Sequence, residues 1–134
     1  MTIDGDGPAG TATRVLYIDD NHDNVFLLRR LFKRSCPDIE LHTAMTGGDG
    51  IRAAIEEQPA LILLDNRLPD TNGEQVLRQL AATPATAGIP VVILSADSNP
   101  VIVRDLLAAG AADFLAKPFD GQQLLAILGR YLPR

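Results

Sequence analysis

The feature that most constrains the fold of this chain is a repeated alternation between short apolar runs and longer segments with helical spacing. Three of the runs, VLYI, LILL and VVIL, contain no charged residue, which is typical of strands that are covered on both faces. Strands are predicted at residues 15–18, 39–44, 60–64, 90–95 and 113–116. A predicted helix follows each strand, at residues 23–35, 48–57, 73–82, 99–109 and 120–132.

Strands that alternate with helices in this way predict an α/β fold, in which a parallel sheet carries helices on both faces. Connections between parallel strands are right-handed, and the loop after every strand opens at the carboxyl edge of the sheet. Ligands of such sheets bind at this edge, where the strand order reverses. We therefore expect the chemistry of the protein in the residues that directly follow each strand.

Composition sets the class of protein and excludes several kinds of site. With 134 residues, of which 46% are hydrophobic and 22% charged, the chain is long enough for one domain with a sizeable core. Residues 1–13 show no periodicity and are predicted to form a flexible tail, and residues 14–134 form the domain. The single cysteine, Cys36, excludes an internal disulfide and a cysteine-based zinc site.

Charge and hydropathy argue against nucleic-acid and membrane partners. Lys and Arg number 12 against 17 Asp and Glu, a net charge of −5, and no basic run is present, so we expect no direct binding to nucleic acid or to anionic membranes. No apolar run reaches the roughly 18 residues of a membrane span. The first residues lack the pattern of a signal peptide, and we expect a cytoplasmic protein.

Charged and hydroxyl side chains follow four of the predicted strands. Asp19 and Asp20 follow the first strand, Asp65 the third, Ser95 the fourth and Lys117 the fifth. Taken singly, the aspartates and the serine have an ordinary explanation as helix caps or turn residues. Lys117 lies between apolar residues in the sequence, and a partly buried lysine needs a partner. The convergence of all these side chains on one edge of the sheet favours a functional site.

Three carboxylates close together repel one another, and this repulsion indicates what else the site requires. Lys117 supplies one positive charge, and a divalent cation supplies two more. Oxygen ligands without cysteine or clustered histidine favour a hard ion, Mg²⁺ (or Mn²⁺), over Zn²⁺. With both cations in place, a phosphoryl dianion is able to enter. Ser95 and Lys117 then contact its oxygens, and the Asp65 carboxylate is a competent nucleophile.

Four motifs carry a resemblance to a known family. They are VLYIDDN (15–21), LILLDNRLPDTNG (61–73), VVILSA (91–96) and AAGAADFLAKPF (108–119). Together they make the chain resemble, from Arg14 to about Tyr131, a response-regulator receiver domain of bacterial two-component signalling, in the CheY-like superfamily. The resemblance implies a flavodoxin-like (βα)5 fold, which is a doubly wound, five-stranded parallel sheet of order 2-1-3-4-5.

The resemblance also assigns roles around the first and third strands. It implies that Asp65 is the phospho-acceptor and that Asp19, Asp20 and Asp65 are metal ligands, with Asp20 more direct than Asp19. The backbone carbonyl of Arg67 is implied as a further metal ligand. In the family the positions of Arg67 and Asp97 tune the lifetime of the phosphoryl group. We expect these two side chains to pair across the mouth of the site.

Further positions match the family at the last two strands. Ser95 and Lys117 are implied to contact the phosphoryl group, and the peptide bond between Lys117 and Pro118 is cis in the family. Phe114 matches an aromatic switch position. The Ser95 hydroxyl would move towards the phosphoryl group, and Phe114 would fill the vacated space. Many members carry tyrosine at this position, so a switch at Phe114 has to work through volume alone.

The predicted function is that of a phospho-accepting receiver in a two-component system or phosphorelay. The receiver would take a phosphoryl group from the phosphohistidine of a cognate histidine kinase or phosphotransfer protein. It would catalyse its own phosphorylation and dephosphorylation without being a conventional enzyme. Because the chain ends after the fifth helix, we expect a single-domain regulator, or a receiver excised from a hybrid kinase or a larger regulator.

Other functions fit the sequence less well. A phosphatase with an aspartyl-phosphate intermediate requires D-x-D-x-[TV] on the first strand, and IDDNH does not supply it. A pseudo-receiver would bind proteins without ever taking phosphate, but the presence of Asp20, Asp65, Ser95 and Lys117 speaks against it. The glycine-rich segment TGGDG (46–50) lacks the P-loop pattern of nucleotide-binding proteins and is interpreted as a strand-to-helix turn.

The last two helices carry more apolar residues than one buried stripe requires. The excess predicts a surface patch around the fourth helix, the fifth strand and the fifth helix, where a downstream protein partner would bind. The apolar residues are Val101, Ile102, Val103, Leu106, Leu107, Leu124, Leu125, Ile127, Leu128, Tyr131 and Leu132.

Overall fold

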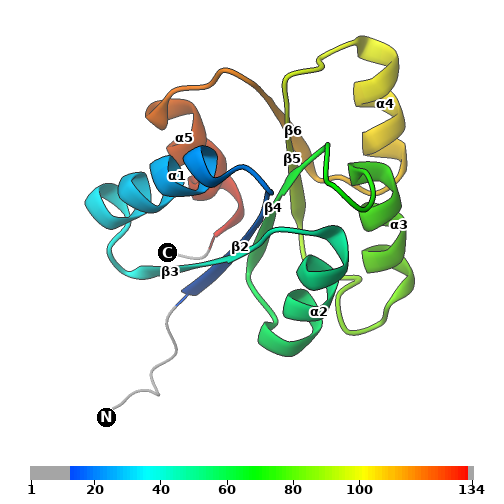
Figure 1. Cartoon of the computed structure of the whole chain (residues 1–134), viewed down its shortest axis with the longest axis horizontal. Coiled ribbons are helices and arrows are strands. Elements are labelled where there is room, and N and C mark those ends of the chain that lie inside the picture. Colours follow the sequence, from blue (N-terminus) through cyan, green and yellow to red (C-terminus); the bar gives the residue numbers. More distant parts are fainter. Residues whose placement is uncertain (1–12, 133–134) are drawn as a thin grey trace.

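The structure, a computed structural model, describes residues 13–132 and contains one parallel sheet with helices on both faces (Figure 1). Its strands are β2 (Thr13–Ile18), β3 (Ile39–Ala44), β4 (Leu61–Asp65), β5 (Val91–Ser95) and β6 (Asp113–Ala116). Its helices are α1 (His22–Ser35), α2 (Gly47–Glu57), α3 (Gly73–Ala82), α4 (Pro100–Ala108) and α5 (Gly121–Tyr131). The order β3-β2-β4-β5-β6 confirms the predicted topology, and the ends of every predicted element agree within two residues.

The sheet divides the core into two layers, because successive residues of a strand point to opposite faces. Val15 and Tyr17 of β2 pack with residues of α1 and α5, whereas Leu16 and Ile18 pack with residues of α2, α3 and α4. Figure 1 shows these two groups of helices on opposite sides of the sheet. Residues 61–64 of β4 are all 0% exposed, which explains why this stretch of the strand carries no charged residue before Asp65.

The beginning of the domain differs slightly from the prediction. The predicted tail, residues 1–13, lies outside the described residues except for Thr13, which begins β2 opposite Ile39.

Cys36, just after α1, is a free and half-buried thiol. Within residues 13–132, no helix has the length and apolar character needed to cross a membrane.

The predicted apolar patch over the last two helices is wrong for α5. The large apolar side chains of α5 are buried or half-buried in the core layer that α5 shares with α1. On α4, Val101 and Leu107 are exposed as predicted. The most exposed large apolar side chains of residues 13–132 lie on α1 instead, where Phe26 is 59% and Leu27 61% exposed. Helical spacing cannot reveal this difference, because it does not show that α1 lies beside α5.

Candidate functional site

The three aspartates predicted at the carboxyl edge converge in the structure. Asp19 and Asp20 follow β2, Asp65 ends β4, and these strands are neighbours in the sheet. One carboxylate oxygen from each aspartate lies within 4.8 Å of the others. Asp19 is buried, Asp65 half-buried and Asp20 exposed, so the cluster opens to solvent on the side of Asp20.

The residues that follow the strands are not needed to cap the next helices. The N-cap of α1 is Asn21, that of α3 is Asn72 and that of α4 is Asn99. Each of these side chains accepts a hydrogen bond from a backbone N–H in the first turn of its helix. Asp120 caps α5 and forms a capping box with Gln123. The ordinary explanation of the site residues as helix caps is therefore wrong.

Asp19 is 1% exposed, and three donors of this chain hold its carboxylate. Its Oδ1 accepts from the Asn21 N–H at 2.9 Å, and its Oδ2 accepts from the Tyr17 hydroxyl at 2.5 Å and the Asn24 amide at 3.1 Å. Sequence reasoning missed Tyr17 and Asn24. For Tyr17 a signal exists, because a buried tyrosine hydroxyl needs a partner and residues two apart on a strand share a face.

Lys117 pairs with Asp65, as its place between apolar residues predicts. Its Nζ lies 3.0 Å from Asp65 Oδ1 and 3.8 Å from Asp19 Oδ2. The Lys117 N–H donates to the Ser95 carbonyl at 2.8 Å, which ties the end of β6 to the end of β5. The peptide bond between Lys117 and Pro118 is cis, as the resemblance implies. One cation therefore faces two of the three carboxylates.

The Asp65 carboxyl has a pKa above its ordinary value, chiefly because burial disfavours the charged form. The side chain is only 13% exposed. The hydrogen bond and charge of Lys117 lower this pKa but do not cancel the effect of burial, and the charge of Asp19 raises it further. A second cation beside Asp65 would offset both the burial of this carboxylate and its repulsion by Asp19. The charge balance of the cluster therefore favours a metal ion.

A cavity beside Asp65 brings Ser95 into the site. Its volume is about 400 Å³, and its lining residues are Asp65, Arg67, Ser95, Ala96, Asp97 and Lys117. Ser95 is buried, and its hydroxyl oxygen accepts from the Asp97 N–H at 3.1 Å. The expected ion pair between Arg67 and Asp97 is absent from the described part of the chain. The Asp97 carboxylate instead accepts from the Asn99 N–H at 3.2 Å, in the turn before α4.

Phe114, the predicted switch residue, lies on β6 opposite Ile93 of β5. Its side chain is half-buried and packs against the core layer on the side of α2, α3 and α4. The aromatic ring therefore stands at the boundary between this core layer and solvent, close to α4. Its role as a switch stays a prediction.

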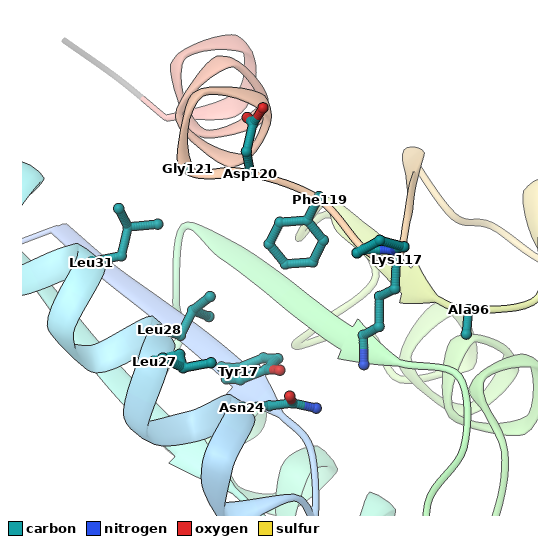
Figure 2. A pocket seen from close by; sticks show the side chains of 11 residues that line it. Tyr17, Asn24, Leu27, Leu28, Leu31, Ala96, Lys117, Phe119, Asp120 and Gly121 are labelled. Atoms are coloured by element: carbon teal, nitrogen blue, oxygen red, sulfur yellow. The ribbon is translucent and has the colours of Figure 1, made fainter.

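An apolar groove adjoins the site between α1 and the loop after β6. The groove has a volume of about 560 Å³ and is lined by Leu27 and Leu28 of α1, by residues 117–120 of the loop and by Gly121 at the start of α5. Figure 2 shows the Phe119 ring facing the leucines of α1, with the Lys117 side chain beside it. Ala96 and Lys117 line both the groove and the cavity at Asp65, so the two hollows adjoin.

The ligand atoms of the acidic cluster fit Mg²⁺. Asp19, Asp20 and Asp65 offer only carboxylate oxygens, and within residues 13–132 no histidine or cysteine joins them. Hard cations such as Mg²⁺ prefer oxygen ligands and retain several of their waters. The exposed side of the cluster, at Asp20, leaves space for such waters. The cluster is therefore consistent with a magnesium site.

Comparisons with known proteins agree with this arrangement. The family model of the response regulator receiver domain matches residues 15–129. Response regulator PleD of Caulobacter vibrioides is 37% identical over 115 residues, which are 86% of this chain and 25% of PleD. Protein PilH of Pseudomonas aeruginosa is 31% identical over 119 residues, 89% of this chain and 97% of PilH. The chain thus spans a quarter of the first relative and nearly all of the second.

Solved structures share the fold. The receiver domain of sensor histidine kinase PA1611 from Pseudomonas aeruginosa has a TM-score of 0.81 and 26% identity, covering 90% of this chain and 98% of that one. That structure holds a magnesium ion coordinated in its active site cleft. A chemotaxis response regulator of Vibrio cholerae, with a TM-score of 0.82 and 24% identity over 91% of this chain and 100% of that one, supports the fold alone.

Proposed function

Because the chain belongs to the response regulator receiver domain family, the phospho-accepting receivers of two-component systems, we propose that Asp65 takes a phosphoryl group from the phosphohistidine of a histidine kinase. The observation that carries this proposal is the 3.0 Å contact between Lys117 Nζ and Asp65 Oδ1 within a cluster of three carboxylates. Receiver domains pair with histidine kinases, and a phosphotransfer protein presents the same phosphohistidine chemistry.

The ionised Asp65 carboxylate is the proposed nucleophile. One of its oxygens attacks the phosphorus atom, and the new O–P bond forms as the P–N bond to the donor imidazole breaks. The imidazole leaves with the electron pair of that bond. Lys117 stabilises charge on one phosphoryl oxygen, and the Ser95 hydroxyl donates a hydrogen bond to another. With water as the attacking group, the same residues release inorganic phosphate.

The metal ligands in this proposal are Asp19, Asp20, Asp65 and the backbone carbonyl of Arg67. When bound, Mg²⁺ (or Mn²⁺) supplies the positive charge that allows a phosphoryl dianion to enter an acidic site. Asp20 is exposed and stands open to direct contact. Asp19 already accepts three hydrogen bonds from this chain, which supports the less direct role assigned to it.

The phospho-donor domain is proposed to dock across the groove beside α1. Leu27 is 61% exposed at this groove, and Lys117 lines the groove as well as the cavity at Asp65. An apolar side chain near the donor phosphohistidine would fill the groove while the phosphoryl group reaches Asp65. This arrangement uses the exposed apolar surface of α1, which the fold itself leaves uncovered.

The proposed readout surface is the face formed by α4 and β6. Val101 and Leu107 of α4 are exposed there, and Phe114 lies half-buried on the adjacent strand. A pseudo-receiver that only binds proteins would use the same face. It would have no need of a lysine 3.0 Å from Asp65 within a carboxylate cluster, so the geometry favours a phospho-accepting receiver.

The test is incubation with acetyl phosphate and Mg²⁺, followed by measurement of the intact mass. We expect the wild type to gain one phosphoryl group and Asp65→Asn to gain none. Asp105→Asn, which removes an exposed carboxylate of α4, is the matched control and should behave as the wild type. EDTA should abolish the gain. An unmodified wild type would favour the pseudo-receiver, and equal phosphorylation in EDTA would contradict the metal site.

A further inference from the structure

The loop that follows the phospho-acceptor, residues 65–73, is closed by its own backbone. The Gly73 N–H donates to the Asn66 carbonyl at 2.9 Å, and Arg67 and Asn72 form an antiparallel bridge. The residues between Arg67 and Asn72 therefore form the tip of a compact loop. The loop adjoins the acidic cluster through Asp65, and it carries Arg67.

Asp70, at the tip, reaches from this loop to the first turn of α2. Its Oδ1 accepts from the Gly47 N–H at 2.8 Å, and its Oδ2 accepts from the Gly48 N–H at 3.0 Å. N–H groups in the first turn of a helix have no partner within the helix. The side chain of Thr46, the N-cap of α2, accepts from the Asp49 N–H at 3.0 Å and leaves the Gly47 and Gly48 N–H groups to Asp70. The loop after β4 therefore supplies a large part of the cap of α2.

The two backbone hydrogen bonds lower the pKa of the Asp70 carboxyl below its ordinary value. Asp70 is therefore ionised at neutral pH, and a negative charge at the N-terminus of α2 is favourable for the helix dipole. The contact has the form of a charge-assisted pair of hydrogen bonds, which is stronger than a pair between neutral groups. Such a contact is able to fix the tip of the loop.

Gly47 allows the loop to approach α2 this closely. A Cβ atom on Gly47 would lie 2.3 Å from Thr71 Cγ2, whereas one on Gly48 would meet nothing nearer than Asp70 Oδ2 at 3.7 Å. The approach of the loop thus requires glycine at position 47 and tolerates a side chain at position 48. This requirement accounts for part of the glycine-rich segment 46–50, which the sequence alone presents as an ordinary turn.

We propose that Asp70 is a positioning residue, which latches loop 65–73 onto α2 and thereby holds the Arg67 carbonyl in place for metal binding. We call its two hydrogen bonds to α2 the Asp70 latch. The inference rests on the proposed function, since it requires a metal site at Asp65. Asp65 is fixed at one end of the segment by β4, and the latch fixes the other end. Arg67 lies between these two anchors.

Coupling between the Asp70 latch and the metal site has to be reciprocal. If the closed latch favours metal binding, then metal binding favours the closed latch by the same factor. Hydrogen exchange at the Gly47 and Gly48 amides reports the latch directly, because Asp70 is their acceptor. A role limited to the stability of α2 would not make Mg²⁺ slow the exchange of these amides more than it slows exchange across the whole fold.

The test is calorimetric titration of Mg²⁺ into the wild type, Asp70→Ala and Asp70→Asn. Asp49→Ala, which removes a carboxylate from the same turn of α2 without touching the loop, is the control. We expect Asp70→Ala to weaken Mg²⁺ binding about tenfold, as loss of a supporting contact does at other metal sites. Asp70→Asn should weaken it less, because the amide keeps one acceptor oxygen.

A second pair of variants keeps the test decisive where Asp70→Ala does not fold. Gly47→Ala displaces Thr71 and should weaken Mg²⁺ binding, whereas Gly48→Ala should not. In the wild type, Mg²⁺ should slow exchange of the Gly47 and Gly48 amides more than it slows exchange across the whole fold. Wild-type Mg²⁺ affinity in the folded variants of Asp70 and in Gly47→Ala would overturn the latch. A wild type that binds no Mg²⁺ would reject the proposed function itself, and the latch with it, before any variant is compared.

Discussion

At the residue scale, burial and charge act in opposite directions on Asp65. Burial raises the pKa of this carboxyl, and Lys117 offsets only part of the effect. When folding raises the pKa of a carboxyl, the protonated form of that carboxyl favours the folded state. This stabilisation is fully present below the unfolded-state pKa and is lost as the pH rises through the folded-state pKa. Ionised Asp65 therefore destabilises the fold at neutral pH. We expect Asp65→Asn to raise the free energy of unfolding at pH 7, with the gain disappearing as the pH falls towards 4.

Urea unfolding of the wild type and Asp65→Asn across this pH range measures the effect. Asp105→Asn, which removes an exposed carboxylate, should show no comparable gain at pH 7. If Asp65→Asn is less stable than the wild type at pH 7, attraction between Lys117 and Asp65 outweighs burial.

Tyr17 shows how a residue of the buried layer supports the site. Its hydroxyl donates to Asp19 Oδ2 at 2.5 Å, and burial together with Asp19 raises the pKa of Tyr17, so it stays protonated. We expect Tyr17→Phe to lower the free energy of unfolding by about 1.5–3 kcal/mol, as for hydrogen bonds to charged groups. The Tyr131 hydroxyl donates to Asp113 in a more exposed place, so Tyr131→Phe should lower the free energy of unfolding by less. Equal losses in urea unfolding would contradict a special role for Tyr17.

The residues that follow the strands could be predicted, but those that hold them in place could not, apart from Tyr17, whose buried hydroxyl needs a partner. Asp19, Asp65 and Lys117 are identified by their positions after apolar runs, which the sequence displays directly. Asn24 and Asp70 act across distances that no periodicity encodes. Asp70 accepts hydrogen bonds from residues 22 and 23 positions away, and only the packing of the loop on α2 brings them together.

At the scale of elements, the sequence predicts burial correctly for strands that are covered on both faces of the sheet. It predicts burial wrongly for a helix whose exposure depends on a neighbouring helix. The central strands are covered on both faces, so their apolar runs mark them clearly. The apolar stripe of α5 is wider than the sheet alone can cover, and the sequence therefore predicts that part of the stripe is exposed. In the structure α5 shares a core layer with α1, and the large apolar side chains that the sheet does not cover are buried there.

The proposed readout elements, α4 and β6, give a second kind of test. Beryllofluoride with Mg²⁺ mimics the acyl phosphate, and in the wild type it should shift the NMR signals of residues 99–119 as well as those beside Asp65. Phe114→Ala should keep the shifts beside Asp65 but lose those of α4. Phe26→Ala, which removes an exposed ring from α1, is the control and should keep both. Wild-type shifts confined to the surroundings of Asp65 would exclude this route.

At the scale of the whole molecule, the acidic cluster links stability to metal binding. A ligand that binds only the folded state adds about 2.7 kcal/mol of stability at a hundred times its Kd. We expect Mg²⁺ to raise the melting temperature of the wild type but not of Asp20→Ala. Without Mg²⁺, Asp20→Ala should be at least as stable as the wild type, because repulsion among the carboxylates is relieved.

Thermal unfolding with and without Mg²⁺ checks this linkage. Asp23→Ala, which removes an exposed acid from the first turn of α1, is the matched control and should respond to Mg²⁺ as the wild type does. Equal stabilisation of Asp20→Ala and the wild type by Mg²⁺ would place the ion elsewhere on this acidic molecule.

The central claim is that Asp65 is the residue that carries the phosphoryl group, and its chemistry allows a direct measurement. Borohydride reduces an aspartyl phosphate to homoserine, which peptide mapping by mass spectrometry locates in the sequence. After treatment with acetyl phosphate and Mg²⁺, the account predicts homoserine at position 65 and at no other aspartate. Homoserine at Asp19 or Asp20, or none at position 65 in protein that has gained a phosphoryl group, would contradict it.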